Sequence, residues 1–335
     1  MIAFLEKIAD RLLSKFPTSL EGVAVVLPSK RAVVFLKHYL SQKIKKPIFL
    51  PDFYSIEEFA EKISGLTVLD NISLQFKLYQ SYIAFPPKKI DSFDDFLSWS
   101  NVLLHDFNEI DRNLVDASSI YTNLKNVKEL ENWDVDNWSL AEDNLSNMQH
   151  NYISFFERML DWYTHFNDSL SKEQTAYQGM AYKLASKNIS TFEIKWNNVW
   201  FVGLNALTKS EQEIIDYLKR EDIARLFWDA DSFYYDNPQH EAGIFLRQQR
   251  QRWSEIDFNI VGDYFNKKKE SFNVVACPKN ITQAKVAAEV VKGFEASDLD
   301  NSNTAIVLAD EALLFPVLHN LPSEIKQLNV TMGSP

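Results

Sequence analysis

The stretch VAVVL at residues 23–27 decides the fold: it is a short apolar run that closes at Pro28. A second run, NVWFV at 198–202, closes at Gly203, and a third, IARLFW, occupies 223–228. Runs of this length between turn residues are typical of strands that are buried on both faces of a parallel sheet. We therefore expect all three to lie side by side in one parallel sheet, although about 170 residues separate the first two.

A helix is predicted directly after the first run. Apolar residues at helical spacing share one face, and basic residues fall on the opposite face because each residue turns the helix by about 100°. The apolar face is predicted to hold Ala32, Phe35, Leu36, Tyr39 and Leu40, and the opposite face Lys30, Arg31, Lys37 and His38.

The next two elements repeat this pattern. Residues 48–50 (IFL) form a second short apolar run between prolines, and Ser55 opens a helix with Glu58 three residues later, which is a capping box. Strand, helix, strand and helix in succession predict an α/β fold.

Helical patterns dominate from about residue 70 to 190, and four tryptophans lie in this block, with a loop-like stretch near 130–146. After 198–202, Thr208 and Glu211 form a second capping box, and a further helix is predicted at about 240–253. The last α/β segment is predicted to hold strands at 272–276 (FNVVA) and 304–308 (TAIVL) with a helix over 281–294. The closing NVTMGSP stops where a strand should turn, so we expect a fragment of a longer chain.

Charge is distributed unevenly along the 335 residues, whose net charge is −11. No acidic residue occurs from Gly22 to Pro51, a window with six Lys and Arg, whereas 91–150 holds thirteen Asp and Glu against three basic residues. The window could attract phosphate and the acidic stretch would repel it.

The sequence also bears on cellular location. The amphipathic N-terminus differs from a signal peptide, no apolar run approaches the length of a membrane span, and the lone Cys277 fits a reducing compartment. We expect a cytoplasmic protein with no membrane partner.

The residues that common catalytic sites require are absent from the sequence. The closest two of the eight glycines are nineteen residues apart, so neither phosphate-binding glycine motif can be written. The six histidines are scattered without metal-ligand spacing. We therefore predict no catalytic residue, cofactor or metal in this chain. Pro51-Asp52 with Gln75-Phe76-Lys77 is a near match to a metal-nuclease pattern that chance explains better, and Glu193-Ile194-Lys195 has no Pro-Asp within sequence reach.

Six fragments, in order, resemble one known family. They are VLPSKRAVVFLKHYL (26–40), PDFYSIEEF (51–59), LLHDFNEIDRNL (103–114), NNVWFVGLNALTKSEQEII (197–215), FNVVACPKNITQAKVAAEVV (272–291) and LNVTMGSP (328–335). The chain resembles AddB/RecB-like subunits, in which a PD-(D/E)XK nuclease follows an inactivated superfamily I (UvrD-like) helicase region. No single fragment is a strong motif, and the resemblance rests on their order.

The resemblance implies a RecA-like domain interrupted by a helical insertion, followed by the start of a second RecA-like domain. The implied ranges are 1–69 and 196–265 for the first domain, 70–195 for the insertion and 266–335 for the second. It places Ser29 and Lys30 in a motif that touches single-stranded DNA, and Ser55 where a DNA-contacting threonine occurs. The strand at 198–202 would end in an acidic ATPase pair, but Gly203, Leu204 and Asn205 follow it. The nuclease would lie beyond this chain.

Two functions remain open on these grounds. One is a non-catalytic DNA-binding and scaffold region of a break-repair helicase–nuclease subunit, with contacts at Ser29, Lys30, Arg31, Lys37 and Ser55, and possible partners in DNA and a partner subunit. The other is a RecA-like protein-interaction module that does not touch DNA. The basic helix face could equally be solvated surface, Ser55 could serve only as a helix cap, and the tryptophans fit core packing better than base stacking. An enzyme with an unrecognised site is the least favoured reading.

Overall fold

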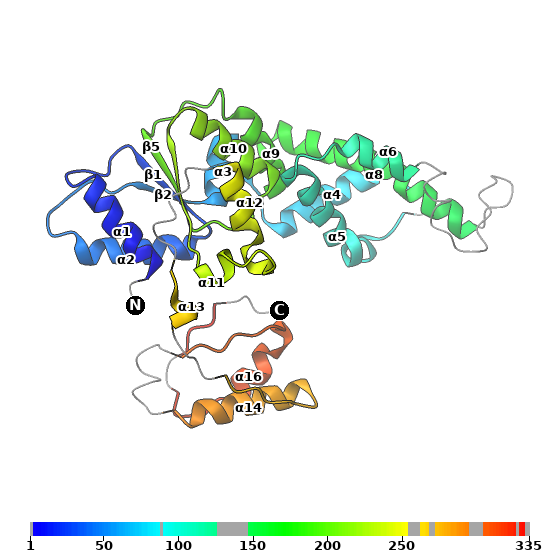
Figure 1. Ribbon diagram of the computed structural model, residues 1–335. Helices are drawn as coiled ribbons and strands as arrows, with labels where there is room; N and C mark the ends of the chain where they lie inside the picture. The colour runs from blue at the N-terminus through cyan, green and yellow to red at the C-terminus, as the bar shows by residue number, and fades with distance from the viewer. Residues whose placement is uncertain are drawn as a thin grey trace. The chain divides into compact units, whose positions relative to one another are not determined.

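The computed structural model of the chain describes residues 3–87, 90–125, 147–253, 262–267, 272–294, 304–325 and 328–331 (Figure 1). It divides into two compact units, Met1–Lys268 and Lys269–Pro335. The larger unit contains a parallel sheet and a helical region, and the described residues of the smaller unit include two helices and segments without regular secondary structure.

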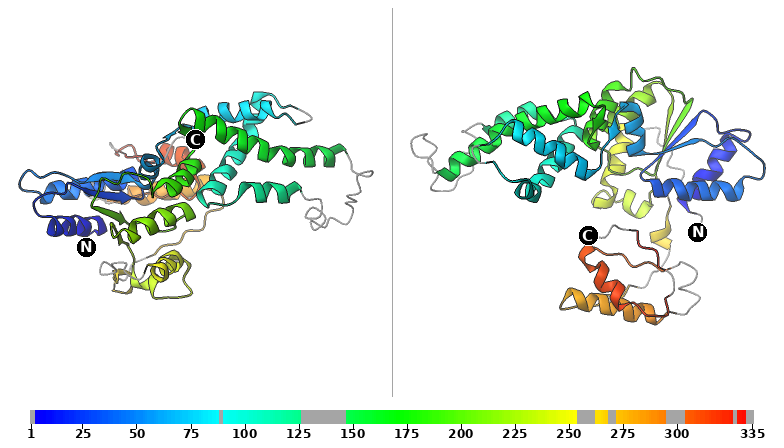
Figure 2. Two further views of the ribbon diagram at one scale, coloured as in Figure 1. Left: turned by 90° about the horizontal axis from the view of Figure 1, so that it is seen from above. Right: turned by 180° about the vertical axis from the view of Figure 1, so that it is seen from behind.

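The sheet has four parallel strands in the order β2-β1-β5-β6. Helices of the larger unit flank this sheet (Figures 1 and 2). They are β1 (Val23–Leu27), β2 (Asp52–Ser55), β5 (Asn198–Val202) and β6 (Ala224–Phe227). Val25 of β1 pairs with Trp200 of β5, and Phe201 of β5 pairs with Leu226 of β6. The predicted adjacency of the three apolar runs is therefore confirmed, including the pairing of strands that lie far apart in sequence.

Helices cover both faces of this sheet, as the unbroken apolar runs require. Val23, Val25 and Leu27 point to one side, where α1 (Phe4–Lys15) and α2 (Lys30–Lys43) pack. Ala24 and Val26 point to the other side, where three further helices pack. These are α3 (Ile56–Ser64), α9 (Gln178–Asn188) and α10 (Lys209–Arg220), and α3 and α10 each begin with the predicted capping box.

Two details of the first βαβ unit differ from the prediction. The second strand is β2 at Asp52–Ser55, and Phe49 and Leu50 are exposed. Pro51 lacks a backbone N–H and restricts the residue before it, so pairing with β1 begins only after it. The buried face of α2 holds Val33, Leu36 and Leu40, whereas Phe35 is 53% exposed. The predicted and the observed buried faces of α2 share Leu36 and Leu40. Contact with the sheet decides which neighbouring residues join them in the core.

The region predicted as an all-helical insertion is mainly helical. It comprises α4 (Asn71–Ala84), α5 (Phe93–Arg112), α6 (Ala117–Lys125) and α8 (Asn147–Lys172). A short parallel pair of strands, β3 (Thr67–Val68) and β4 (Thr175–Ala176), joins the two ends of this region. The sequence did not predict this pair, because a strand of two residues gives no periodic pattern. The predicted range also includes α9, which packs against α3 and α10 and so joins the sheet core.

Aromatic side chains form the core of this helical region. Trp162 is fully buried and donates to the Phe85 carbonyl at 2.8 Å, and the partly buried Trp99 donates to Asp91 at 3.2 Å. Core packing of these two tryptophans is confirmed, and the predictions for Trp133, Trp138 and the 130–146 loop lie outside the described residues. No helix in the described part of the chain is long and apolar enough to cross a membrane.

A buried carboxylate joins the helical region to α9. Asp111, fully inaccessible near the end of α5, accepts hydrogen bonds from Tyr163 at 2.5 Å and from Tyr177, and forms an ion pair with Lys183 at 2.7 Å. The neighbouring Arg112 carbonyl accepts from Ser210 of α10. This polar cluster therefore fixes where α5 lies against the sheet domain.

The smaller unit contains α14 (Asn280–Lys292), a 3-10 turn η3 (Glu311–Leu313) and α16 (Leu314–Asn320). The helix predicted over 281–294 is confirmed. The strands predicted at 272–276 and 304–308 are wrong, because both segments are irregular in the structure. Both have strand-like sequences, but a strand forms only when a neighbouring strand accepts its backbone hydrogen bonds, and neither segment has such a neighbour among the described residues.

Candidate nucleic-acid interface

The edge of the sheet where its strands end is the natural place for a binding site. Chain connections leave β1 and β5 in opposite directions, toward β2 and toward β6, so the boundary between these two neighbours is the switch point of the fold. Ligands of open parallel sheets bind outside the carboxyl ends of strands at such a point. Ser29 and Lys30 follow β1 there, and Gly203 follows β5.

Ser29 is an exposed N-cap residue. Its hydroxyl accepts the Ala32 amide of α2 at 3.3 Å, which places α2 with its first turn at the switch point. The helix begins here because the side chain replaces a backbone partner that the first turn lacks. The first-turn amides of α2 and the Ser29 side chain therefore lie at the carboxyl end of β1, and helix N-termini of this kind favour anions.

The positive charge of Lys30 is partly neutralised by a neighbouring carboxylate that the sequence did not indicate. Its ammonium lies 2.9 Å from a carboxylate oxygen of Glu58, and that hydrogen bond raises the pKa of Lys30. Glu57 and Glu61 line the same small hollow, of about 140 Å³, next to Tyr182. A phosphate at Lys30 would have to displace Glu58 and approach two further carboxylates.

The remaining basic residues of the acid-free window differ in their surroundings. Lys37 is exposed and its ammonium lies 5.0 Å from the centre of the Phe53 ring, a cation–π contact. Lys43 pairs with Glu6 and Asp10 of α1 at 3.2 and 2.7 Å. Arg31, Lys37, Lys45 and Lys46 are exposed, and these four residues form the basic surface of the window apart from Lys30.

Ser55 is enclosed within its capping box. It is 1% exposed, its hydroxyl donates to Glu58 at 3.2 Å, and the Glu58 amide donates back to that hydroxyl at 3.2 Å. A base or phosphate could reach this hydroxyl only if the first turn of α3 opened. The cap role proposed from the sequence accounts for Ser55 completely.

The end of β5 carries no carboxylate. Gly203 adopts a φ of +71°, Leu204 is buried, and the Asn205 carbonyl accepts from the Gln249 amide. A side chain at Gly203 would meet the Phe4 ring at 3.2 Å, so α1 closes over this turn. The turn that would hold an acidic ATPase pair is thus formed by uncharged residues packed against the N-terminal helix.

Carboxylates occur instead at the end of β6, at Asp229 and Asp231. Burial raises the pKa of Asp229, and Asp231 accepts the Phe233 amide at 3.0 Å and the Tyr264 amide at 2.8 Å. Asp231 is therefore occupied in holding its own loop. Across the described residues, no group of three or more His, Cys, Asp and Glu side chains could hold a metal ion.

The two near matches to a metal-nuclease pattern are arranged differently from the sequence reading. Lys77 pairs with Glu173 at 2.6 Å rather than with Asp52. Asp52 and the Glu193–Lys195 segment, about 140 residues apart, line one hollow of about 280 Å³. Asp52 accepts the Trp196 indole N–H at 2.7 Å there. This juxtaposition has no signal in the sequence, because it depends on β2 lying beside the chain that enters β5.

Comparison with known proteins adds no relative: no family model matches the chain, and no curated protein matches it.

Proposed function

We propose that this chain is a non-catalytic, helicase-like region that binds DNA and acts as a scaffold within a break-repair helicase–nuclease subunit. In this proposal the four-stranded sheet is a degenerate RecA-like domain, and the helices between β3 and β4 are its insertion. The observation that carries it is α2: a helix with an acid-free, basic exposed face that starts at the switch point of the sheet. Contacts from such a face would go to backbone phosphates, which carry no sequence information.

The experiment measures binding of labelled single-stranded DNA and of duplex ends as salt is raised. Counterion release makes the logarithm of affinity fall linearly with the logarithm of salt, by about one for each phosphate contact. Arg31→Glu with Lys37→Glu should lower this slope by about two. Lys30 is left unchanged, because a glutamate there would face three others and destabilise the fold.

Lys187→Glu on α9 is the matched control, since it reverses an exposed charge outside the acid-free window. Its slope should equal that of the unaltered chain. Ser55→Ala should also leave the slope unchanged while lowering stability by about 1 kcal/mol through loss of the cap. A slope that Ser55→Ala lowers would instead support the DNA contact implied by the family resemblance.

A second candidate is a protein-interaction module that does not bind DNA. The observation that favours it is the Lys30–Glu58 ion pair. This pair neutralises the positive charge at the start of α2, and two further glutamates line the same hollow as Lys30. Affinity that is absent, or that the Arg31 and Lys37 reversals do not alter in a folded protein, would favour this function over the first.

A further inference from the structure

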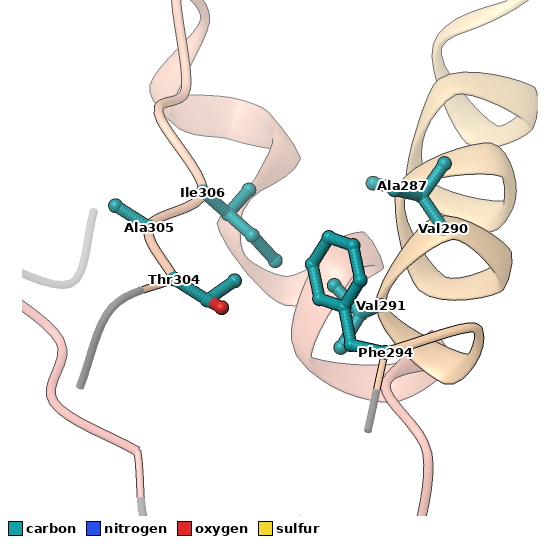
Figure 3. A pocket seen from close by; sticks show the side chains of 7 residues that line it. All are labelled: Ala287, Val290, Val291, Phe294, Thr304, Ala305 and Ile306. Atoms are coloured by element: carbon teal, nitrogen blue, oxygen red, sulfur yellow. The ribbon is translucent and has the colours of Figure 1, made fainter. Parts of the chain in front are cut away.

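Charged side chains of both signs line the small hollow at the start of α2. Lys30 contributes a positive charge to it, and Glu57, Glu58 and Glu61 of α3 contribute three negative charges. The hollow of about 430 Å³ in the smaller unit is different, because its seven described lining residues are all uncharged and the Phe294 ring points into it (Figure 3). The hollow at Lys30 therefore has the charge needed to affect a phosphate, and it adjoins the proposed DNA-binding face.

Glu58 connects the starts of α2 and α3. Leu27 at the end of β1 pairs with Ser55, which brings the first turns of the two helices together. One carboxylate oxygen of Glu58, Oε1, lies 2.9 Å from the Lys30 ammonium. The other, Oε2, accepts the Ser55 backbone amide at 3.0 Å and the Ser55 hydroxyl at 3.2 Å. The capping box therefore fixes the carboxylate, and the lysine, whose side chain is 75% exposed, is the partner that is able to leave.

The three glutamates oppose an anion at a place that would otherwise attract one. The first-turn amides of α2 and the Lys30 ammonium both favour a phosphate there. A phosphate at Lys30 would lie beside Glu58 and near two further carboxylates, and charges of like sign repel at short range. Exposed ion pairs contribute little to stability because solvent screens them. The main effect of the Lys30–Glu58 pair therefore falls on an approaching phosphate rather than on the fold.

We propose that Glu58 determines where DNA crosses α2, by holding Lys30 in an ion pair and keeping phosphates away from the first turn of the helix. A bound strand then uses Arg31 and Lys37, and Lys30 adds a phosphate contact only when the carboxylate is removed. Glu58 acts through Lys30, so it is a positioning residue rather than a DNA contact. This inference rests on the proposed function and adds to it the residue that limits the binding face.

The test is Glu58→Gln, measured as the salt dependence of single-stranded DNA binding. Glutamine also serves at this position of a capping box, so α3 should keep its start. The slope of log affinity against log salt should become steeper by about one, for one added phosphate contact. Affinity at low salt should rise by about two- to fivefold, the range expected for one exposed charge pair. Glu57→Gln is the matched control, because it removes an equal charge from the same hollow without breaking the Lys30–Glu58 pair, and its slope should equal that of the unaltered chain.

Lys30→Gln separates a released lysine from a general loss of negative charge. On its own it should leave the slope unchanged, and combined with Glu58→Gln it should abolish the gain. A Glu58→Gln slope equal to that of the unaltered chain, or a gain that survives Lys30→Gln, would overturn the inference while the Arg31 and Lys37 reversals still support the proposed function. If neither the unaltered chain nor Glu58→Gln bound DNA, both proposals would fail.

A measurement without DNA tests the ion pair itself. The hydrogen bond to Glu58 raises the pKa of the Lys30 ammonium above its ordinary value of 10.5. In an NMR titration of the lysine side chains, Glu58→Gln should therefore lower this pKa, and Glu57→Gln should change it far less. Equal pKa values in the unaltered chain and in Glu58→Gln would show that the carboxylate does not hold Lys30, which would overturn the inference whatever the DNA measurements gave.

Discussion

Removal of the buried Asp111 carboxylate should destabilise the larger unit by about 4 kcal/mol. The structure gives the carboxylate three partners: the Tyr163 and Tyr177 hydroxyls and the Lys183 ammonium. A buried hydrogen bond to a charged group contributes roughly 1.5–3 kcal/mol, so two hydroxyl donors account for most of this loss. The Lys183 side chain is partly exposed and its ion pair adds little after solvent screening. The sum lies within the roughly 3–5 kcal/mol found when one partner of a buried pair is removed.

The assay is urea unfolding of the Asp111→Ala variant, followed by tryptophan fluorescence and far-ultraviolet circular dichroism. Asp111→Asn keeps the shape and one acceptor oxygen, so it should cost less, about 2 kcal/mol. Asp106→Ala on the same helix is the control, since Asp106 is exposed and should change stability by no more than about 0.5 kcal/mol. If Asp111→Ala and Asp106→Ala unfolded at the same urea concentration, the buried cluster would not hold α5 in place and the reasoning would be refuted.

Two further expectations concern alkaline pH and ATP. Burial raises the pKa of Tyr121, Tyr163 and Tyr177 above the ordinary value of 10.0. Above pH 10 the folded chain therefore keeps phenol protons that the unfolded chain loses. The free energy of unfolding should fall as pH rises above 10, by about 1.4 kcal/mol per pH unit for each tyrosine. Tyr121→Phe should remove one such contribution from the pH-dependence of urea midpoints. It should not destabilise the chain at neutral pH, because the buried Tyr121 hydroxyl has no hydrogen-bond partner among the described residues. An unchanged alkaline slope would contradict the assignment. Titration of a fluorescent ATP analogue with magnesium should give no saturable micromolar binding, since no glycine loop exists and uncharged Gly203–Asn205 follows β5; specific binding would require a phosphate site of another kind.

The sequence by itself determined the elements whose causes are local. Short apolar runs closed by turn residues predicted β1 and β5. The Ser55–Glu58 and Thr208–Glu211 pairs predicted the starts of α3 and α10, because each cap is formed by residues three positions apart. Burial on both strand faces also implied a parallel sheet covered by helices on both sides. These features depend on neighbours in the chain, and the chain displays them directly.

The tertiary structure alone decided which basic side chains are paired with carboxylates and which strand-like segments pair with a neighbour. Glu58 reaches Lys30 because β2 and β1 lie side by side, and this contact moves the basic surface toward Lys37. Among the residues that the structure describes, the two segments with strand sequences, 272–276 and 304–308, form no backbone–backbone hydrogen bond, because a strand needs a partner and its own residues cannot supply one. Local pattern fixes what a segment can form, whereas the contacts between distant segments fix whether it forms and which groups it leaves exposed.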